Sequence, residues 1–269
     1  MAVIIFNHAP MALFYFSLPV IVGLALGMFL MMELGRGVGR WHLRTGRGSI
    51  KDWLGVVDGP IFAIFGLLIA FTFSSAISRF DDRRKLIVEE ANAIGTAYLR
   101  LDLLAPPDRN DLQDKFRKYV DSRLKTYALF PDMNAVLEEY CHSQLLQSQI
   151  WSGAVAAAGK TSTPPASMLL LPALNSMIDI TTARTAATQF HPPLIIYGML
   201  FIMSLVAALL AGYQMASTAK RSWLHMTLFI LCITLASYVI LDIEYPRLGF
   251  IRVDSADSIL KDVRDSFGQ

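Results

Sequence analysis

The stretch that decides the fold is Gly59–Ser78, GPIFAIFGLLIAFTFSSAIS, which contains no charged residue. A helix needs about 20 apolar residues to cross the hydrocarbon core of a bilayer, so this stretch predicts a transmembrane helix. Pro60 falls in its first turn, where a missing backbone N–H costs little. No proline lies between Pro60 and Pro106. We therefore expect one helix from about Ile61 to Leu104, continuing beyond the membrane into water.

Three further stretches have the length and composition of membrane spans: Pro10–Met32, Pro192–Ser217 and Ser222–Leu241, the last uncharged apart from His225. Core helices of soluble proteins seldom sustain such runs four times. The chain is also 54% hydrophobic and only 17% charged, where soluble domains are about a quarter charged. The sequence therefore predicts an all-α integral membrane protein with four transmembrane helices.

We expect four segments: a first transmembrane pair over 1–78, a helical extramembrane domain over 79–190, a second pair over 191–245 and a tail over 246–269. The first 32 residues hold no Lys or Arg, which favours a retained span over a cleaved signal. Within the middle domain, Asp108 is the expected N-cap of a second helix. A third helix is expected from Pro131–Asp132 to Trp151, and a fourth over 167–190. The intervening KTSTPP, 160–165, has the composition of a loop.

Apolar residues after the second span recur at steps of three, four and seven, which predicts a heptad-like seam. The seam comprises Phe80, Ile87, Ala91, Ile94, Tyr98 and Leu101. Small residues also recur four apart within the spans, where they let helices approach closely. They are Gly23 and Gly27, then Gly66, Ala70 and Ser74, then Ala208 and Gly212. We expect homo-oligomerisation through the seam and these stripes.

The membrane orientation stays open. Basic residues in the two short loops favour a cytoplasmic position for those loops; they are Arg36, Arg40, Arg44, Arg47 and Lys51, with Lys220 and Arg221. The cluster that follows the second span favours the opposite orientation; it consists of Arg79, Arg83, Arg84 and Lys85. The number of spans is even in either case, so both termini should face the same side.

No motif points to catalysis. Gly153 and Gly159-Lys160-Thr161 have five residues between the glycines, whereas a phosphate-binding loop has four and follows a strand. Cys141 and Cys232 occur in different settings, so we expect no disulfide between them. No Cys/His spacing resembles a metal site, and a net charge of +2 does not indicate nucleic-acid binding. We predict no enzyme activity, cofactor, metal or nucleic-acid partner.

Several polar residues share helix faces and form a candidate polar network: Glu89, Asn92, Thr96, Arg100, Asn175, Asp179 and Arg184. Solvated surfaces are the alternative interpretation, because most polar stripes are solvated. Asp242 and Glu244 follow the last span as membrane-edge acids. Such residues are either interfacial anchors or, around an oligomer axis, a ring that attracts cations.

Phe62, Phe65 and Ile69 lie at steps of three and four on one face of the second span. Around a symmetry axis this face would form an apolar constriction that gates by dewetting. Packing against lipid or neighbouring spans is the competing interpretation.

The sequence from Glu90 to Tyr98, EANAIGTAY, resembles the bestrophin-like family of bacterial membrane proteins. Further matching positions are Leu101–Leu104, Tyr119-Val120, Arg123, Leu174-Asn175, Met177–Asp179, Arg184, His191-Pro192, Leu241-Asp242, Pro246 and Gly249–Ile251. The resemblance covers about residues 55 to 255, and KTSTPP departs from it as an insertion. It implies a distant likeness to bestrophins, which are pentameric anion channels with four spans per subunit and a hydrophobic neck on the second span.

From this resemblance we expect an oligomeric ion channel of a bacterial inner (plasma) membrane, whose partners are the lipid bilayer, further copies of itself (up to a pentamer) and inorganic ions. The alternative is a non-conducting scaffold or signalling protein that binds a partner through its helical domain. A membrane enzyme would need a polar cavity with an acid–base pair.

Overall fold

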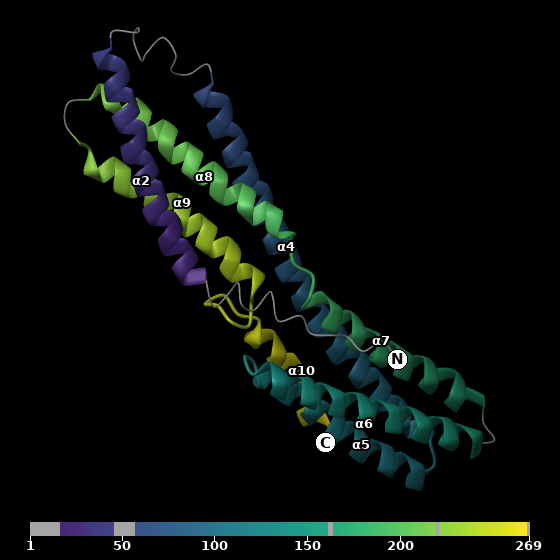
Figure 1. Ribbon diagram of the computed structural model, residues 1–269. Helices are drawn as coiled ribbons and strands as arrows, with labels where there is room; N and C mark the ends of the chain where they lie inside the picture. Colours follow the sequence, from purple (N-terminus) through teal and green to yellow (C-terminus); the bar gives the residue numbers. More distant parts are fainter. Residues whose placement is uncertain (1–16, 46–56, 161–163, 219–220, 268–269) are drawn as a thin grey trace. The chain divides into compact units, whose positions relative to one another are not determined.

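The computed structural model describes residues 17–45, 57–160, 164–218 and 221–267, and every regular element in these ranges is a helix (Figure 1). The chain forms two compact units. Residues 8–78 and 191–245 make up the transmembrane unit, and residues 79–190 and 246–269 make up most of the extramembrane unit. Helix α4, Asp58–Leu99, is continuous and contributes to both units.

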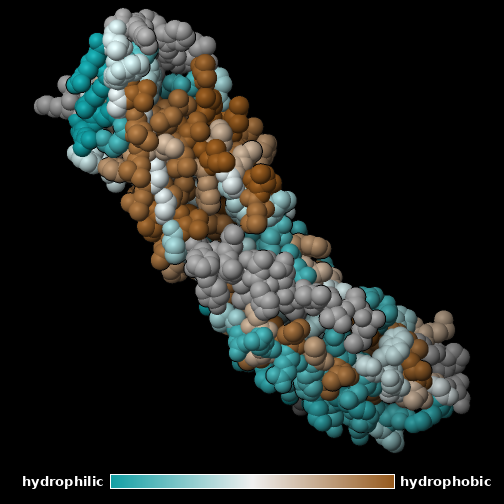
Figure 2. Space-filling model, in the orientation of Figure 1, coloured by the Kyte–Doolittle hydropathy of each residue, from teal (hydrophilic) through white to brown (hydrophobic). Residues whose placement is uncertain are grey.

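The transmembrane unit contains α2 (Ser17–Arg44), the first part of α4, α8 (Leu194–Gln214) with a 3₁₀ turn at Met215–Ser217, and α9 (Trp223–Glu244). Each of the four helices is long and apolar enough to cross a membrane. Hydrophobic side chains gather over them in Figure 2. The prediction of four spans is confirmed, although residues 10–16 of the first predicted span lie outside the described residues.

Helices α2 and α8 pack with their backbones close together, because small residues lie at the crossing. A Cβ added at Gly212 would collide with the backbone of Met32, and one at Gly35 with the backbone of Leu209. Hydrophobic burial does not drive association between helices in lipid, so such close contacts supply the packing energy. Gly66 and Gly23, in contrast, have open space at the Cβ position in the single chain.

The extramembrane unit is a helical bundle around an apolar core. After the end of α4 and a 3₁₀ turn at Arg100–Leu103 come α5 (Pro106–Ala128), α6 (Met133–Lys160), α7 (Pro164–Ala187) and α10 (Asp254–Ser266). The core contains Ile94 and Leu101 from the α4 end, Phe116, Ile150 and Leu174 from α5 to α7, and Leu260 from α10.

The heptad-like seam lies inside this unit. Ile94 and Leu101 are fully buried, and Ile87 packs with Val253 and Ala256 of the same chain. The expectation that the seam joins two chains is therefore wrong, because helices and loops of this chain already cover it. The predicted continuous helix is confirmed as far as Leu99, and the last turn before Leu104 tightens to 3₁₀ geometry.

Several helix boundaries differ from those predicted, and α2 in particular continues to Arg44 instead of ending at Met32. Asp108 is not an N-cap: Ala105 holds that position and Pro106 starts α5, because the fixed φ of proline suits the first helical residue. Helix α6 starts where predicted, with Asp132 accepting hydrogen bonds from the N–H groups of Asn134 and Ala135, but continues to Lys160. Helix α7 already starts at Pro164, so Lys160, Pro164 and Pro165 of the predicted loop KTSTPP belong to helices, and 161–163 lie outside the described residues.

Adding one methyl group at the α2–α8 crossing tests the close packing. Gly212→Ala should destabilise the protein by about 1–3 kcal/mol, because the backbone of Met32 cannot yield cheaply. Gly198→Ala on the same helix is the control, since its added Cβ meets open space. Thermal unfolding in detergent should show a lower midpoint for the first variant only. Equal midpoints would mean that the two helices do not cross at Gly212.

Candidate functional site: a buried arginine–carboxylate network

Glu90 of α4 carries a carboxylate that is 0% exposed and is paired with arginines from two other helices. Arg123 of α5 donates from Nε to Oε1 at 2.7 Å, and Arg184 of α7 donates from Nη1 to Oε2. A lone buried carboxylate would be strongly destabilising, so this pairing is what permits the charge in the core. Three helices that are distant in sequence are thereby joined at one side chain.

Asp257 of α10 extends the network. It accepts a hydrogen bond from Arg184 Nη2 at 2.7 Å and two from Arg247, the shorter being 2.8 Å. The five side chains comprise three guanidinium groups and two carboxylates, so the group carries one excess positive charge.

The aromatic ring of Tyr127 helps to stabilise this excess positive charge. The guanidinium carbons of Arg184, Arg247 and Arg123 lie 3.7, 4.5 and 5.0 Å from its centroid. An aromatic face attracts cations, so one ring can hold several arginines near each other. The Tyr127 hydroxyl also accepts a hydrogen bond from Arg123 Nη2.

Glu90, Arg123 and Arg184 stay ionised, because their attraction outweighs burial and keeps the pKa of Glu90 below and those of the arginines above their usual values. Burial by itself would lower the pKa of Arg123, but the charge of the Glu90 carboxylate and its hydrogen bond outweigh burial and raise that pKa above its usual value. Burial raises the pKa of Tyr127, which keeps this hydroxyl neutral. None of these groups is poised to exchange a proton near neutral pH, so the arrangement is suited to holding helices together rather than to acid–base chemistry.

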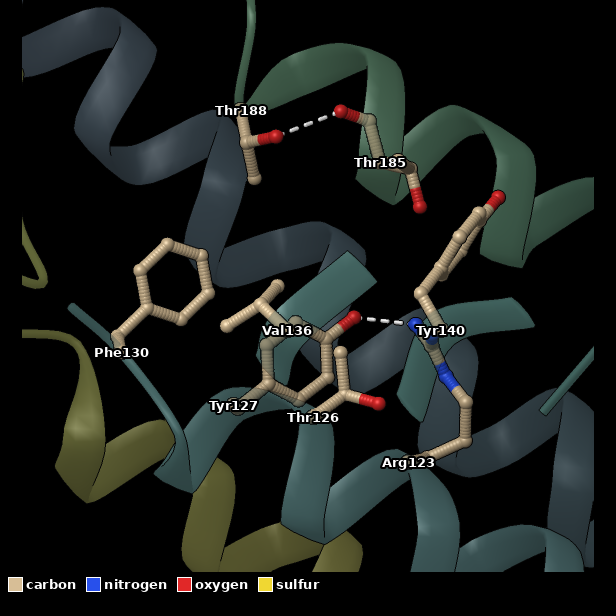
Figure 3. A pocket seen from close by; sticks show the side chains of 8 residues that line it. All are labelled: Arg123, Thr126, Tyr127, Phe130, Val136, Tyr140, Thr185 and Thr188. Atoms are coloured by element: carbon tan, nitrogen blue, oxygen red, sulfur yellow. Dashed lines mark hydrogen bonds between the residues drawn. The ribbon is translucent and has the colours of Figure 1, made fainter. Parts of the chain in front are cut away.

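A small cavity of about 10 Å³ adjoins the network, and Figure 3 shows the side chains that line it: Arg123, Thr126, Tyr127, Phe130, Val136, Tyr140, Thr185 and Thr188. That volume is roughly what a single water needs. Arg123 Nη1 has no hydrogen-bond partner among the described residues. The cavity is therefore too small for a substrate or cofactor.

A second polar cluster surrounds Glu139 of α6. Its Oε1 accepts a hydrogen bond from Ser122 at 2.6 Å and lies 3.1 Å from His142 Nδ1, and its Oε2 lies 2.6 Å from Lys125 Nζ. Burial would raise the pKa of this carboxyl, but its contacts with Lys125, Ser122 and His142 prevail and lower the pKa to about 2.

Of the seven residues in the candidate polar network, Arg184 is the one that joins the buried cluster. Glu89, Asn92 and Thr96 are exposed. Arg100 donates to the Leu169 carbonyl at 2.6 Å, and Asn175 and Asp179 hydrogen-bond to each other at the surface. Within a single chain the seven do not form one network. Glu90 was not among the seven. It lies three residues after Ile87 and four before Ile94, on the same helix face as the apolar seam. A carboxylate on that face indicates a buried side chain that needs a cationic partner.

The candidate constriction residues face helices of their own chain. Phe65 is only 4% exposed, and the Phe62 ring lies edge-on to Phe229 at 6.4 Å. Ile69 is partly buried. The uncovered face of α4 instead presents Ile64, Leu67 and Phe71, which are 59%, 54% and 65% exposed.

The membrane-edge acids are buried within the transmembrane unit. Glu244 Oε1 lies 3.1 Å from His191 Nδ1, and the Tyr238 hydroxyl donates to Asp242 at 3.1 Å. In the single chain neither carboxylate is exposed enough to act as an interfacial anchor.

Removing the central carboxylate tests its role. Glu90→Gln would leave the buried Arg123 without a charged partner and Arg184 with Asp257 alone, and should cost about 3–5 kcal/mol of stability. Glu89→Gln, on the same helix but exposed, should change stability by less than about 0.5 kcal/mol. Thermal or urea unfolding in detergent measures both. If the two variants unfold alike, Glu90 does not hold the bundle together.

The low pKa of Glu139 predicts an acid-sensitive contribution to stability. Its folded-state pKa is about 2, below the usual 4.5, so its contribution is complete above the usual value and is lost as pH falls from there toward 2. Glu139→Gln should therefore reduce the fall in melting temperature between neutral pH and about pH 3. Its neighbour Glu138 is exposed, and Glu138→Gln should keep the wild-type fall. An unchanged acid profile for Glu139→Gln would contradict the assignment.

Proteins of known family and structure resemble this chain over most of its length. A bestrophin-like domain matches residues 23–257. Among solved structures, two variants of a bacterial bestrophin homologue from Klebsiella pneumoniae superpose with TM-scores of 0.68 and 0.64, at 11% and 14% sequence identity, over 93% of this chain and 99% of theirs. No curated protein matches closely enough to add to this. The structural likeness shows a shared fold, and the domain match covers most of the chain, so the protein belongs to the bestrophin-like family.

Proposed function

We propose that copies of this chain form a homo-oligomeric ion channel in the bacterial inner membrane, with α4 nearest the axis. The observation that carries the proposal is the poor burial of α4 by its own chain. In its apolar stretch 17% of the residues are buried, the lowest share of the four spans, against 22% for α2, 28% for α8 and 39% for α9. A membrane helix with so much uncovered surface must contact lipid, another copy or a water-filled path. Membership of the bestrophin-like family favours a conducting assembly over lipid alone.

The uncovered face of α4 carries small residues as well as large ones. Ala63, Gly66, Ala70 and Ser74 are exposed, and a Cβ at Gly66 would meet open space. Small residues on a membrane helix allow a neighbouring helix to approach closely. This supports contact between α4 helices of adjacent copies.

Two faces of α4 compete for the role of an apolar constriction. Phe62, Phe65 and Ile69 remain one candidate set, but burial of Phe65 favours packing within the subunit. The other set consists of Ile64, Leu67 and Phe71. Because these side chains are exposed in the single chain, they can face the symmetry axis of an oligomer. We propose the second set as the constriction, because a pore-lining side chain cannot also be buried inside its own subunit.

Polar substitutions on the two faces distinguish these roles. Leu67→Ser should wet the constriction and raise ion flux in proteoliposomes, with oligomer size unchanged. Phe65→Ser should instead lower the melting temperature by removing a buried ring and leave flux at the wild-type level. The reverse result would assign the constriction to Phe62, Phe65 and Ile69. If wild type and both variants remain impermeable to small anions and cations at verified incorporation, the channel proposal fails.

A non-conducting scaffold would then be the better function. Helix α6 favours that alternative, because Leu137, Leu145 and Val155 are exposed on the extramembrane unit. Exposed apolar side chains on a water-facing helix are where a partner helix would dock.

A further inference from the structure

Arg36 is the most poorly satisfied charged side chain described in the transmembrane unit. It lies on α2, beside the glycines that pack against α8, and is 3% exposed. None of Nε, Nη1 and Nη2 has a hydrogen-bond partner within the described residues. Buried polar groups are nearly always hydrogen-bonded, so three unpaired guanidinium nitrogens indicate a missing acceptor.

The charges around Arg36 do not supply that acceptor. Arg40 and Arg221 are like-charged neighbours, and Glu33 is the nearby carboxylate. Glu33 already accepts a hydrogen bond from Arg221 Nη2 to Oε2 at 2.6 Å, while its Oε1 is buried and unpaired. Among the described residues, three guanidinium groups against one carboxylate leave two excess positive charges, so rotation of Glu33 toward Arg36 could not neutralise the cluster.

The position along α2 suggests which anion fits. The uncharged run ends at Met32, and Arg36 follows one turn later, at the depth where the apolar core gives way to headgroups. Arginine binds phosphate oxygens through a planar fork of donors, and anionic lipids concentrate negative charge at this depth. The negative end of the α2 dipole lies near Arg44, two turns beyond, and its effect is confined to the last turn.

We propose that Arg36, together with Arg40 and Arg221, binds a phosphate group at this end of the transmembrane unit. The phosphate belongs either to the headgroup of an anionic phospholipid or to free inorganic phosphate. The site does not depend on conduction, so it can be tested whether or not the protein forms a channel.

The test uses the full-length protein, delipidated in a maltoside detergent, at constant ionic strength. Phosphatidylglycerol, phosphatidylcholine and sodium phosphate are added separately, thermal unfolding is followed, and bound phospholipid is counted by native mass spectrometry. We expect wild type to be stabilised by several degrees. A response to phosphatidylglycerol without one to inorganic phosphate assigns the site to an anionic lipid, and a response to inorganic phosphate assigns it to the free ion.

Arg36→Met should abolish this stabilisation while leaving the ligand-free melting temperature equal or higher, because it removes an uncompensated buried charge. Arg36→Lys keeps the positive charge but loses the planar fork of N–H donors. It should therefore show a smaller ligand-induced rise in melting temperature than wild type, even if Arg36→Met folds poorly. Arg44→Met removes an exposed cation from the same helix and should respond like wild type.

The proposal is overturned if no ligand stabilises wild type, or if the Arg36 variants respond as wild type does. It is also overturned if Arg36→Met lowers the ligand-free melting temperature of a folded protein, since Glu33 would then be its partner.

Discussion

The charge of Glu90 is the constraint on which the extramembrane unit depends. A carboxylate at a fully buried seam position requires cations at fixed positions, and Arg123 and Arg184 provide them from α5 and α7. Those arginines need further compensation, which comes from Asp257 on α10 and the ring of Tyr127. Each added charge thus requires the next, and residues 246–267 are drawn into the same unit as residues 79–190. A hydrophobic core alone would tolerate slippage of helices along their seams, whereas a paired ion network accepts one register.

This network acts on the helix that also supplies the second span. Because α4 is continuous from Asp58 to Leu99, Glu90 fixes the register of the same helix whose apolar face is left uncovered at Ile64, Leu67 and Phe71. The two parts of α4 therefore have different roles. One is bound to its own chain through paired charges, and the other is left for lipid, other copies or a pore.

Composition and periodicity were sufficient to predict the four spans, the all-α class and the long helix, because these features are local in sequence.

The polar network was harder to predict from the sequence. The sequence selected Glu89, and the structure buries Glu90, a rotation of about 100° around the helix. Pairing among Glu90, Arg184 and Asp257 joins positions up to about 170 residues apart, and no helical spacing encodes such a contact. Burial of Glu90 could still have been predicted from the sequence, because Glu90 lies on the same helix face as the apolar seam. Arg36 was read as a loop charge, although α2 continues to Arg44 and buries it, because glycines allow α8 to pack against this part of the helix.

The direct test of the account is a cryo-EM map of the wild-type protein in lipid nanodiscs. We predict a ring of identical subunits with the α4 helices innermost, Ile64, Leu67 and Phe71 facing the axis, and Phe65 packed within each subunit. A monomer, or a ring in which this face of α4 contacts lipid on the outside, would contradict it.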